Sequence, residues 1–261
     1  MKTRVISAFI MLPLLGILYV GGLPLLWGCF LVGLWGMREF YQAFQQANIK
    51  SFPVVGYISL LLLYALQLFE IASSGLGLWL FITVLLCLGT LFYRFEEAQL
   101  LGPLVTLVGV LYVGFFSFHI VLIHQSPLPL LVWLTVIVAF GTDIFAYFTG
   151  YLFGKHKLCP AISPKKTVEG AVGGLLGSMV LTLGFLYFFS PDLLLHGLWI
   201  GFMGSLLSQV GDLVASMFKR KLGIKDYGTL IPGHGGILDR FDSVLFTGPF
   251  IYYSILWVLI S

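Results

Sequence analysis

Long apolar runs constrain this chain most. Runs of about 17–25 residues with few charges follow one another along its length, and a helix of that length crosses a hydrocarbon core of about 30 Å. A soluble domain would instead alternate apolar and polar faces at period 2 or 3.6. Hydrophobic residues make up 59% of the sequence and charged residues 10%, so little chain is left for a soluble domain.

The sequence therefore predicts an all-α, polytopic integral membrane protein with about nine transmembrane helices; eight or ten spans are the alternatives. The expected spans cover residues 5–21, 23–41, 53–70, 76–93, 101–123, 128–152, 168–189, 193–217 and 243–260.

The basic residues predict the orientation of these spans. With the N-terminus in the cytoplasm, nine spans place all 14 Lys and Arg on the cytoplasmic side, as the positive-inside rule requires. The net charge of +3 thus indicates topology and not nucleic-acid binding, and the basic groups would face anionic lipids. The first span has a basic start but no small-residue cleavage site, so we expect it to be retained.

Polar residues are concentrated in the second half of the chain. Residues 1–130 hold few of them, and we expect transmembrane scaffold helices there without catalytic groups. Three polar clusters, 141–157, 162–170 and 211–242, each adjoin the cytoplasmic end of a span. Non-helical backbone near a membrane is tolerated where it lines a cavity. We therefore expect 131–261 to be a transmembrane catalytic region, integrated with the scaffold and open to the cytoplasm.

Asp143 lies inside an expected span, and an intramembrane carboxylate is a functional candidate by default. Tyr147, four residues on, shares its helix face. Gly150 and Gly154 continue this face and allow another backbone to approach closely. The alternative for Asp143 is a structural bond to a Ser or Thr of a neighbouring helix.

The second cluster, ISPKKTVEG, contains a predicted helix start. Ser163-Pro164 is typical of an N-cap followed by proline at the first helical position. Lys165 and Lys166 would then oppose the helix dipole, and a phosphate bound there would remove the conflict. Glu169 would pair with Lys165 one turn later. Alternatively, both lysines face only water and lipid headgroups.

In the third cluster Asp212 comes late in a span, flanked at i−4 and i+4 by Ser208 and Ser216. Asp239 and Asp242 share a helix face at i, i+3. Asp212, Asp239, water and substrate phosphates would suit Mg²⁺, which prefers one or two carboxylates with phosphate oxygens. The alternative is a structural cluster in which Asp239 or Asp242 pairs with nearby basic groups.

A basic, glycine-rich loop connects these aspartates. It runs through Lys219-Arg220-Lys221, Lys225-Asp226 and the PGHGG stretch 232–236. Gly235 and Gly236 let backbone amides approach a ligand, as phosphate-cradling loops do. His234 is a metal ligand, a donor to phosphate or a turn residue. A zinc site is not expected, because the His and Cys residues lack ligand spacing.

The stretch 216–242, SMFKRKLGIKDYGTLIPGHGGILDRFD, closely resembles the signature of phosphatidate cytidylyltransferases, also called CDP-diacylglycerol synthases. That signature has Ser, Lys-Arg, Lys-Asp and Gly, and ends in His-Gly-Gly-x-x-Asp-Arg-x-Asp. The Asp-x-x-Ala-Tyr pattern at Asp143, the FGKHKL stretch, ISPKKTVEG and the early REFYQ are also similar to this family.

The resemblance implies a bacterial inner-membrane enzyme of phospholipid biosynthesis, with its active site facing the cytoplasm. It would convert CTP and phosphatidic acid to CDP-diacylglycerol and pyrophosphate, among membrane lipids and as a homodimer. It implies Mg²⁺ held by the aspartates at Asp212 and Asp239, with K⁺ as a second cation; Asp242 is a further candidate ligand.

The remaining expected roles follow the charges of the substrates. Catalytic roles are expected for Asp212, Asp239, Lys219 and Arg240. Substrate-binding roles are expected for Lys165, Lys166, Ser216, Arg220, Lys225, Asp226, His234, Gly235, Gly236, Asp143 and Tyr147.

Other classes fit less well. A transporter would carry charges near the bilayer midplane in repeated halves, whereas here they cluster at one interface. A polyprenol or phytol kinase is the nearer alternative. The Asp-Gly and paired-Asp signature of CDP-alcohol phosphotransferases is absent from the sequence.

Overall fold

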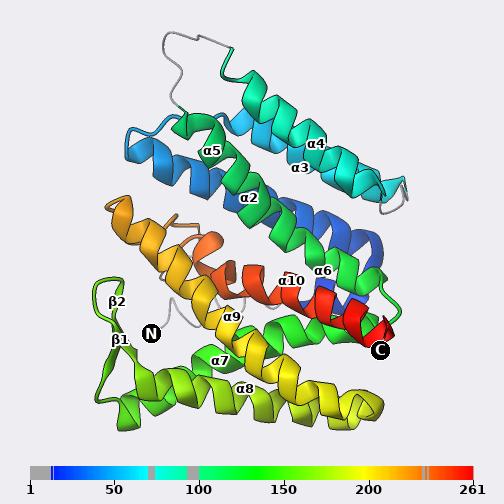
Figure 1. Ribbon diagram of the computed structural model, residues 1–261, viewed down its shortest axis with the longest axis vertical. Helices are drawn as coiled ribbons and strands as arrows, with labels where there is room; N and C mark the ends of the chain where they lie inside the picture. The colour runs from blue at the N-terminus through cyan, green and yellow to red at the C-terminus, as the bar shows by residue number, and fades with distance from the viewer. Residues whose placement is uncertain are drawn as a thin grey trace. The chain divides into compact units, whose positions relative to one another are not determined.

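The computed structural model describes residues 13, 15–69, 74–92, 100–230, 233 and 235–260 (Figure 1). These residues are mostly helical. The helices are α2 (Gly22–Gln46), α3 (Pro53–Leu68), α4 (Ser74–Gly89), α5 (Leu101–Val108), the π-helical η2 (Gly109–Phe115), α6 (Phe116–Gln125), the short η3 (Pro129–Leu131), α7 (Val132–Phe153), α8 (Val168–Phe189), the short η4 (Pro191–Leu193), α9 (Leu194–Lys221) and α10 (Leu238–Ile260). Two strands, β1 (Lys157–Cys159) and β2 (Ser163–Thr167), form an antiparallel hairpin.

The helical, membrane-type class predicted from the apolar runs is confirmed, with the hairpin as its one departure in the described part of the chain. Among the described residues, five helices are long and apolar enough to cross a membrane, and two apolar helices, Pro53–Leu68 and Gly75–Gly89, are shorter. The five are Leu101–Gln125, Pro129–Phe153, Val168–Phe189, Pro191–Lys221 and Leu238–Leu259. Most of the expected first span, 5–21, lies outside the described residues. The count of nine and the orientation stay predictions.

The chain divides into two compact units, each made of two separate stretches. Unit 1 comprises Met1–Val121 and Lys221–Arg240, and unit 2 comprises Leu122–Arg220 and Phe241–Ser261. The glycine-rich loop therefore packs with N-terminal helices. The proposed scaffold and catalytic roles of 1–130 and 131–261 stay predictions.

The core of unit 1 is aromatic. Phe40 and Tyr41 of α2 are almost fully buried, and the ring of Phe40 contacts that of Tyr112 in η2. The Tyr41 hydroxyl donates to the Thr106 carbonyl over 2.9 Å. Buried hydroxyls need such partners. The bond therefore ties α2 to α5.

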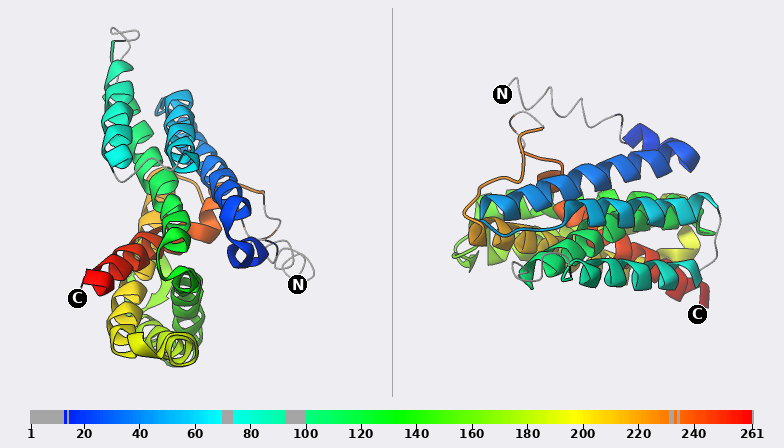
Figure 2. Two further views of the ribbon diagram at one scale, coloured as in Figure 1. Left: turned by 90° about the vertical axis from the view of Figure 1, so that its right-hand side faces the viewer. Right: turned by 90° about the horizontal axis from the view of Figure 1, so that it is seen from above.

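In unit 2, α7 and α8 lie side by side, and Figures 1 and 2 show this from different directions. Small residues make the approach close. A Cβ added at Gly170 would come within 2.7 Å of the Ala146 carbonyl oxygen, and Gly150 packs against Gly170 and Thr167. Small residues let apolar helices pack backbone against backbone. The predicted role of Gly150 in close packing is confirmed.

Polar side chains connect α9 to these two helices. The Thr142 hydroxyl donates to the Ser205 hydroxyl over 2.9 Å, and the Gln209 amide donates to the Ala171 carbonyl over 3.1 Å. Such bonds hold apolar helices in one register, because an unpaired polar group is costly inside them. They place the end of α9 beside the hairpin.

Candidate active site

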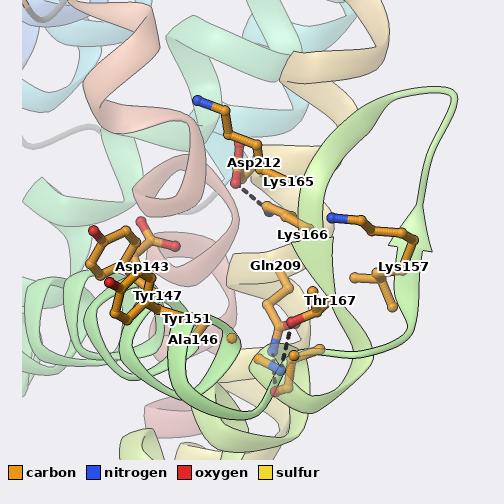
Figure 3. Close-up of a pocket in the computed structure, with 15 residues that line it drawn as sticks. Asp143, Ala146, Tyr147, Tyr151, Lys157, Lys165, Lys166, Thr167, Gln209 and Asp212 are labelled. Atoms are coloured by element: carbon orange, nitrogen blue, oxygen red, sulfur yellow. Dashed lines mark hydrogen bonds and ion pairs between the residues drawn. The ribbon is translucent and has the colours of Figure 1, made fainter.

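A pocket of about 550 Å³ opens in unit 2 among α7, the hairpin, the start of α8 and α9. Its polar lining comprises two carboxylates, three lysines, two tyrosines and an amide: Asp143, Asp212, Lys157, Lys165, Lys166, Tyr147, Tyr151 and Gln209. Figure 3 shows Lys166 reaching Asp212, with Asp143 and Tyr147 on the opposite side of the pocket from Lys157. Opposite charges therefore share one cavity, as a site for a cation and a polyanion requires.

The pocket lysines lie on a strand, so the predicted helix start at Ser163-Pro164 is wrong. Residues 163–167 form β2, and α8 begins at Val168. Thr167 is the N-cap, and its hydroxyl accepts from the Gly170 amide over 3.1 Å. Proline disfavours the α conformation in the residue before it, and Thr at an N-cap supplies the missing acceptor. Lys165 and Lys166 thus reach the pocket from a hairpin and not from a helix turn.

Glu169 fastens this hairpin, and the predicted pairing of Glu169 with Lys165 is wrong. Its carboxylate accepts from the Lys155 amide over 3.0 Å and from the His156 amide over 3.2 Å. It also binds the His156 Nδ1 at 2.6 Å. An acidic residue in the first turn of a helix is favourable. Glu169 therefore fixes the chain that leaves α7 at the start of α8, and strand β1, which begins at Lys157, follows directly.

Asp212 is the acidic centre of the pocket. It forms an ion pair with Lys166 and accepts from the Ser216 hydroxyl at 3.4 Å. Both side chains of the ion pair are about three-quarters buried, with exposed fractions of 25% and 26%. The predicted stripe of Ser216 and Asp212 on one helix face is confirmed. Ser208 is fully buried on α9.

Asp242 lies within electrostatic range of Asp143, Asp212 and Lys219. The position follows from close packing of α9 and α10, because a Cβ added at Gly211 would come within 2.7 Å of the Asp242 carbonyl oxygen. Unit 2 thus places three carboxylates and the Lys219 ammonium within electrostatic range of one another. Repulsion among the carboxylates favours a bound cation.

Arg220 joins the end of α9 to the hairpin. Its Nε donates to the Ile162 carbonyl over 3.2 Å. Arg220 is exposed, so we expect this bond to orient the hairpin and to contribute little to the stability of the fold. The predicted substrate-binding role of Arg220 stays a prediction.

In unit 1 the glycine-rich loop is folded around Asp239. One oxygen of this buried carboxylate, Oδ2, accepts from the Tyr227 amide over 2.8 Å and from the Gly236 amide over 2.9 Å. Gly235 has φ of +85°, and a Cβ there would come within 2.7 Å of the same oxygen. Only glycine meets both requirements easily. The loop therefore holds Asp239 by its backbone.

Arg240 follows Asp239 in the first turn of α10. Its Nε is buried and has no hydrogen-bond acceptor among the described residues. A buried guanidinium N–H without an acceptor is suited to bind a phosphate or carboxylate ligand.

The structure thus brings Asp143, Tyr147, Lys165, Lys166 and Asp212 together in one pocket. Lys219 and Asp242 lie close to its acidic side. Asp239, Arg240, Gly235, Gly236, Lys225 and Asp226 belong to unit 1, where Lys225 and Asp226 are exposed. His234 lies outside the described residues. The roles assigned to all these residues stay predictions.

Several residues at the site were missed from the sequence. Gln209 lines the pocket, and its position one turn before Asp212 inside an apolar run was an available signal. Lys157 and Thr167 line the pocket as well. Nothing local singled them out.

The donor set suits Mg²⁺ that is bound together with substrate. Within the described residues, no group of three or more His, Cys, Asp or Glu side chains is placed to hold a metal by itself. Asp212 is instead neutralised by Lys166. Mg²⁺ takes hard oxygen ligands and commonly completes its shell with water and phosphate oxygens. The carboxylates of the pocket fit this arrangement, and a closed protein cage is not needed.

Comparison with known proteins adds an independent line of observation. The Cytidylyltransferase family matches residues 2–258. A phosphatidate cytidylyltransferase of Staphylococcus haemolyticus is 35% identical over 260 residues, covering 96% of this chain and 97% of its own. Proteins of the same name from Staphylococcus aureus and Staphylococcus epidermidis are 35% and 36% identical, with the same coverage of both chains.

Proposed function

The chain belongs to the Cytidylyltransferase family, and on this premise we propose that it is a phosphatidate cytidylyltransferase of phospholipid biosynthesis. It would join CTP and phosphatidic acid into CDP-diacylglycerol and release pyrophosphate. The observation that carries the proposal is the pocket in which Asp143 and Asp212 face three lysines. Two polyanionic substrates and a divalent cation require this combination of charges.

The reaction needs positioning more than proton transfer. An oxygen of the lipid phosphate forms a bond to the α-phosphorus of CTP, and the bond from that phosphorus to the β-phosphate oxygen breaks. A phosphate monoester with a second pKa near 6 is largely ionised at neutral pH, so no general base is required. The barrier arises from repulsion between the two anions and from charge growing on pyrophosphate.

Lys165, Lys166 and Lys157 would reduce this repulsion. They enter the pocket from the hairpin, which Glu169 and Arg220 fasten at its two ends. Fixed cations lower the barrier most when they need no rearrangement during the reaction. We propose that Lys166 leaves Asp212 for a substrate phosphate when the substrates bind.

Asp212 and Asp239 would hold Mg²⁺, with Asp242 and Asp143 as further ligands or supports. When bound, the ion supplies positive charge to the phosphate oxygens and aligns the reacting groups. Lys219, Arg220, Lys225, His234 and Arg240 would bind the triphosphate and the leaving pyrophosphate. Ser216, Asp226, Tyr147, Gly235 and Gly236 would complete the substrate site. K⁺ is proposed as a second cation.

The membrane arrangement is part of the proposal. We place the protein in the bacterial inner membrane as a homodimer with nine spans, the N-terminus and the active site facing the cytoplasm. The distribution of all 14 Lys and Arg supports this orientation. The acyl chains would stay in the bilayer and enter between helices.

The test is synthesis of CDP-diacylglycerol by the purified protein in detergent. CTP and phosphatidic acid are supplied with and without Mg²⁺, and both products are measured for wild type, Asp239→Asn and Asp192→Asn. Asp192 is exposed, in the short η4 that precedes α9, and serves as the control for loss of one carboxylate. We expect Mg²⁺-dependent product from wild type and Asp192→Asn and little from Asp239→Asn.

Two results would contradict parts of the proposal. Full activity of Asp239→Asn would refute the metal assignment while leaving the reaction in place. Well-folded wild type that makes no CDP-lipid, and spends CTP on another lipid, would instead indicate a lipid kinase.

A further inference from the structure

Glu39 of α2 is a buried carboxylate in the half of the chain expected to be scaffold only. Its side chain is 3% exposed. It accepts from the Ile237 amide over 3.0 Å and from the Leu238 amide over 2.9 Å. Ile237 lies 198 residues further along the chain. Both partners belong to the glycine-rich loop and the start of α10, and all of them lie in unit 1.

These bonds serve the first turn of a helix. The first amides of an α-helix have no acceptor within the helix, and negative charge is favourable at that end. Bonds from an amide to a carboxylate are stronger than neutral ones. Glu39 therefore supplies α10 with a cap from another helix, which explains how this carboxylate is tolerated in a buried position.

Two glycines of the loop leave the space that the Glu39 carboxylate occupies. A Cβ added at Gly228 would come within 2.5 Å of the Glu39 Oε1, and a Cβ at Gly236 would overlap the same carboxylate. Neither glycine has a positive φ, so neither is required by the backbone conformation. The space for the carboxylate is the physical reason for glycine at both positions.

The same short backbone stretch also holds Asp239. Gly236 donates its amide to Asp239, and the next two amides bind Glu39. Three successive amides are thus divided between two carboxylates. Because these three amides are consecutive in the chain, a displacement at Glu39 moves the backbone that holds Asp239.

We propose that Glu39 is a positioning residue for the reaction, which fixes the loop and the start of α10 and thereby sets the place of Asp239. The reaction itself rests on the proposed function; the anchoring of the loop does not. Glu39 touches no substrate in this proposal. Its removal should lower the turnover of bound substrates more than it lowers their binding.

The first variant is Glu39→Gln, which keeps the shape but loses the charge and one acceptor oxygen, so that an amide group faces an amide. Asp192→Asn is the matched control, an exposed carboxylate to amide change. Hydrogen exchange followed by mass spectrometry over residues 221–240 measures the anchoring without reference to activity. We expect the amides around Ile237 and Leu238 to exchange faster in Glu39→Gln than in wild type. In the control their exchange rate should be unchanged.

The second measurement is steady-state kinetics with CTP and phosphatidic acid. Loss of a group that orients a site residue typically costs about 10–100-fold. We expect that loss in kcat, with KM for CTP changed by less than about 3-fold. Wild-type exchange in Glu39→Gln, or a lower melting temperature with unchanged kcat of the folded fraction, would overturn the proposal.

A double-mutant cycle removes the ambiguity of a folding defect. Gly228→Ala should reproduce the loss of kcat, because the added methyl group displaces the Glu39 carboxylate. In a Glu39→Ala background the space is free, so Gly228→Ala should add little further loss. Independent, multiplied losses would contradict the proposal. Gly77→Ala, with nothing within 4 Å of the added Cβ, controls for the substitution itself.

If wild type makes no CDP-lipid, the proposed function fails while the exchange experiment still decides whether Glu39 anchors the loop.

Discussion

The hairpin pocket of unit 2 and the glycine-rich loop of unit 1 hold their charged residues in different ways. In the pocket, Lys166 and Asp212 hold each other by their side chains. In the loop, backbone amides hold Asp239 and Glu39, and glycines make the room. A side-chain ion pair can exchange one partner for a ligand, whereas a carboxylate bound by amides keeps its place. We therefore expect the pocket lysines to be movable and the carboxylate of Asp239 to be fixed.

The largest expected effect would come from removing the charge of Asp212, one of the two carboxylates of the pocket. Asp212→Asn should lower kcat about 10²–10³-fold, the loss found when one group that stabilises transition-state charge is removed from an active site. The assay is CDP-diacylglycerol formation at saturating CTP and Mg²⁺. Asp192→Asn again serves as the control. A loss below about 3-fold would show that Asp212 is not part of the reaction.

A second change tests the packing beneath the pocket. Gly170→Ala should lower the free energy of unfolding by about 1–3 kcal/mol, because the added methyl group meets the Ala146 carbonyl and overpacked sites cost this much. Thermal unfolding in detergent measures it. Gly184→Ala, on the same helix with open space around the added Cβ, should be neutral or slightly stabilising. Equal melting temperatures would contradict close contact of α7 and α8.

A third change tests whether the lysines are movable. Lys166→Met should raise KM for CTP or phosphatidic acid about 10-fold, because a charged hydrogen bond to phosphate is lost, with a smaller change in kcat. Steady-state kinetics with each substrate varied identifies which one Lys166 binds. A loss confined to kcat would indicate that Lys166 acts by holding Asp212, as amides hold Asp239.

The smallest effect on activity is expected from Glu169, which holds the start of the hairpin. Glu169→Gln should reduce kcat/KM only about 2–5-fold, because exposed ion pairs contribute little and the Gln carbonyl still accepts from one amide. Hydrogen exchange of residues 154–160 should increase at the same time. Losses as large as those expected for Glu39→Gln would remove the proposed difference between the two regions.

The helices were largely predictable, because the length of an apolar run fixes a membrane helix without reference to its neighbours. The runs 53–70, 101–123 and 168–189 coincide with α3, the α5 to α6 segment and α8 to within a few residues. The hairpin was not predictable from local patterns. Ser163-Pro164 satisfies the rules for a helix start. The helix nevertheless begins after Thr167, whose hydroxyl caps α8.

The membrane-helical class, the positions of most helices and the identity of the charged groups available for chemistry can all be read from the order of the amino acids. Helical apolar runs and a local signature carry that information within a few tens of residues. Tertiary structure alone decided which charges meet: Lys166 with Asp212, Glu169 with His156 and Glu39 with an amide 198 residues away. Hydrogen bonds and ion pairs act over a few ångströms in space, and distance along the chain does not reveal which groups come that close.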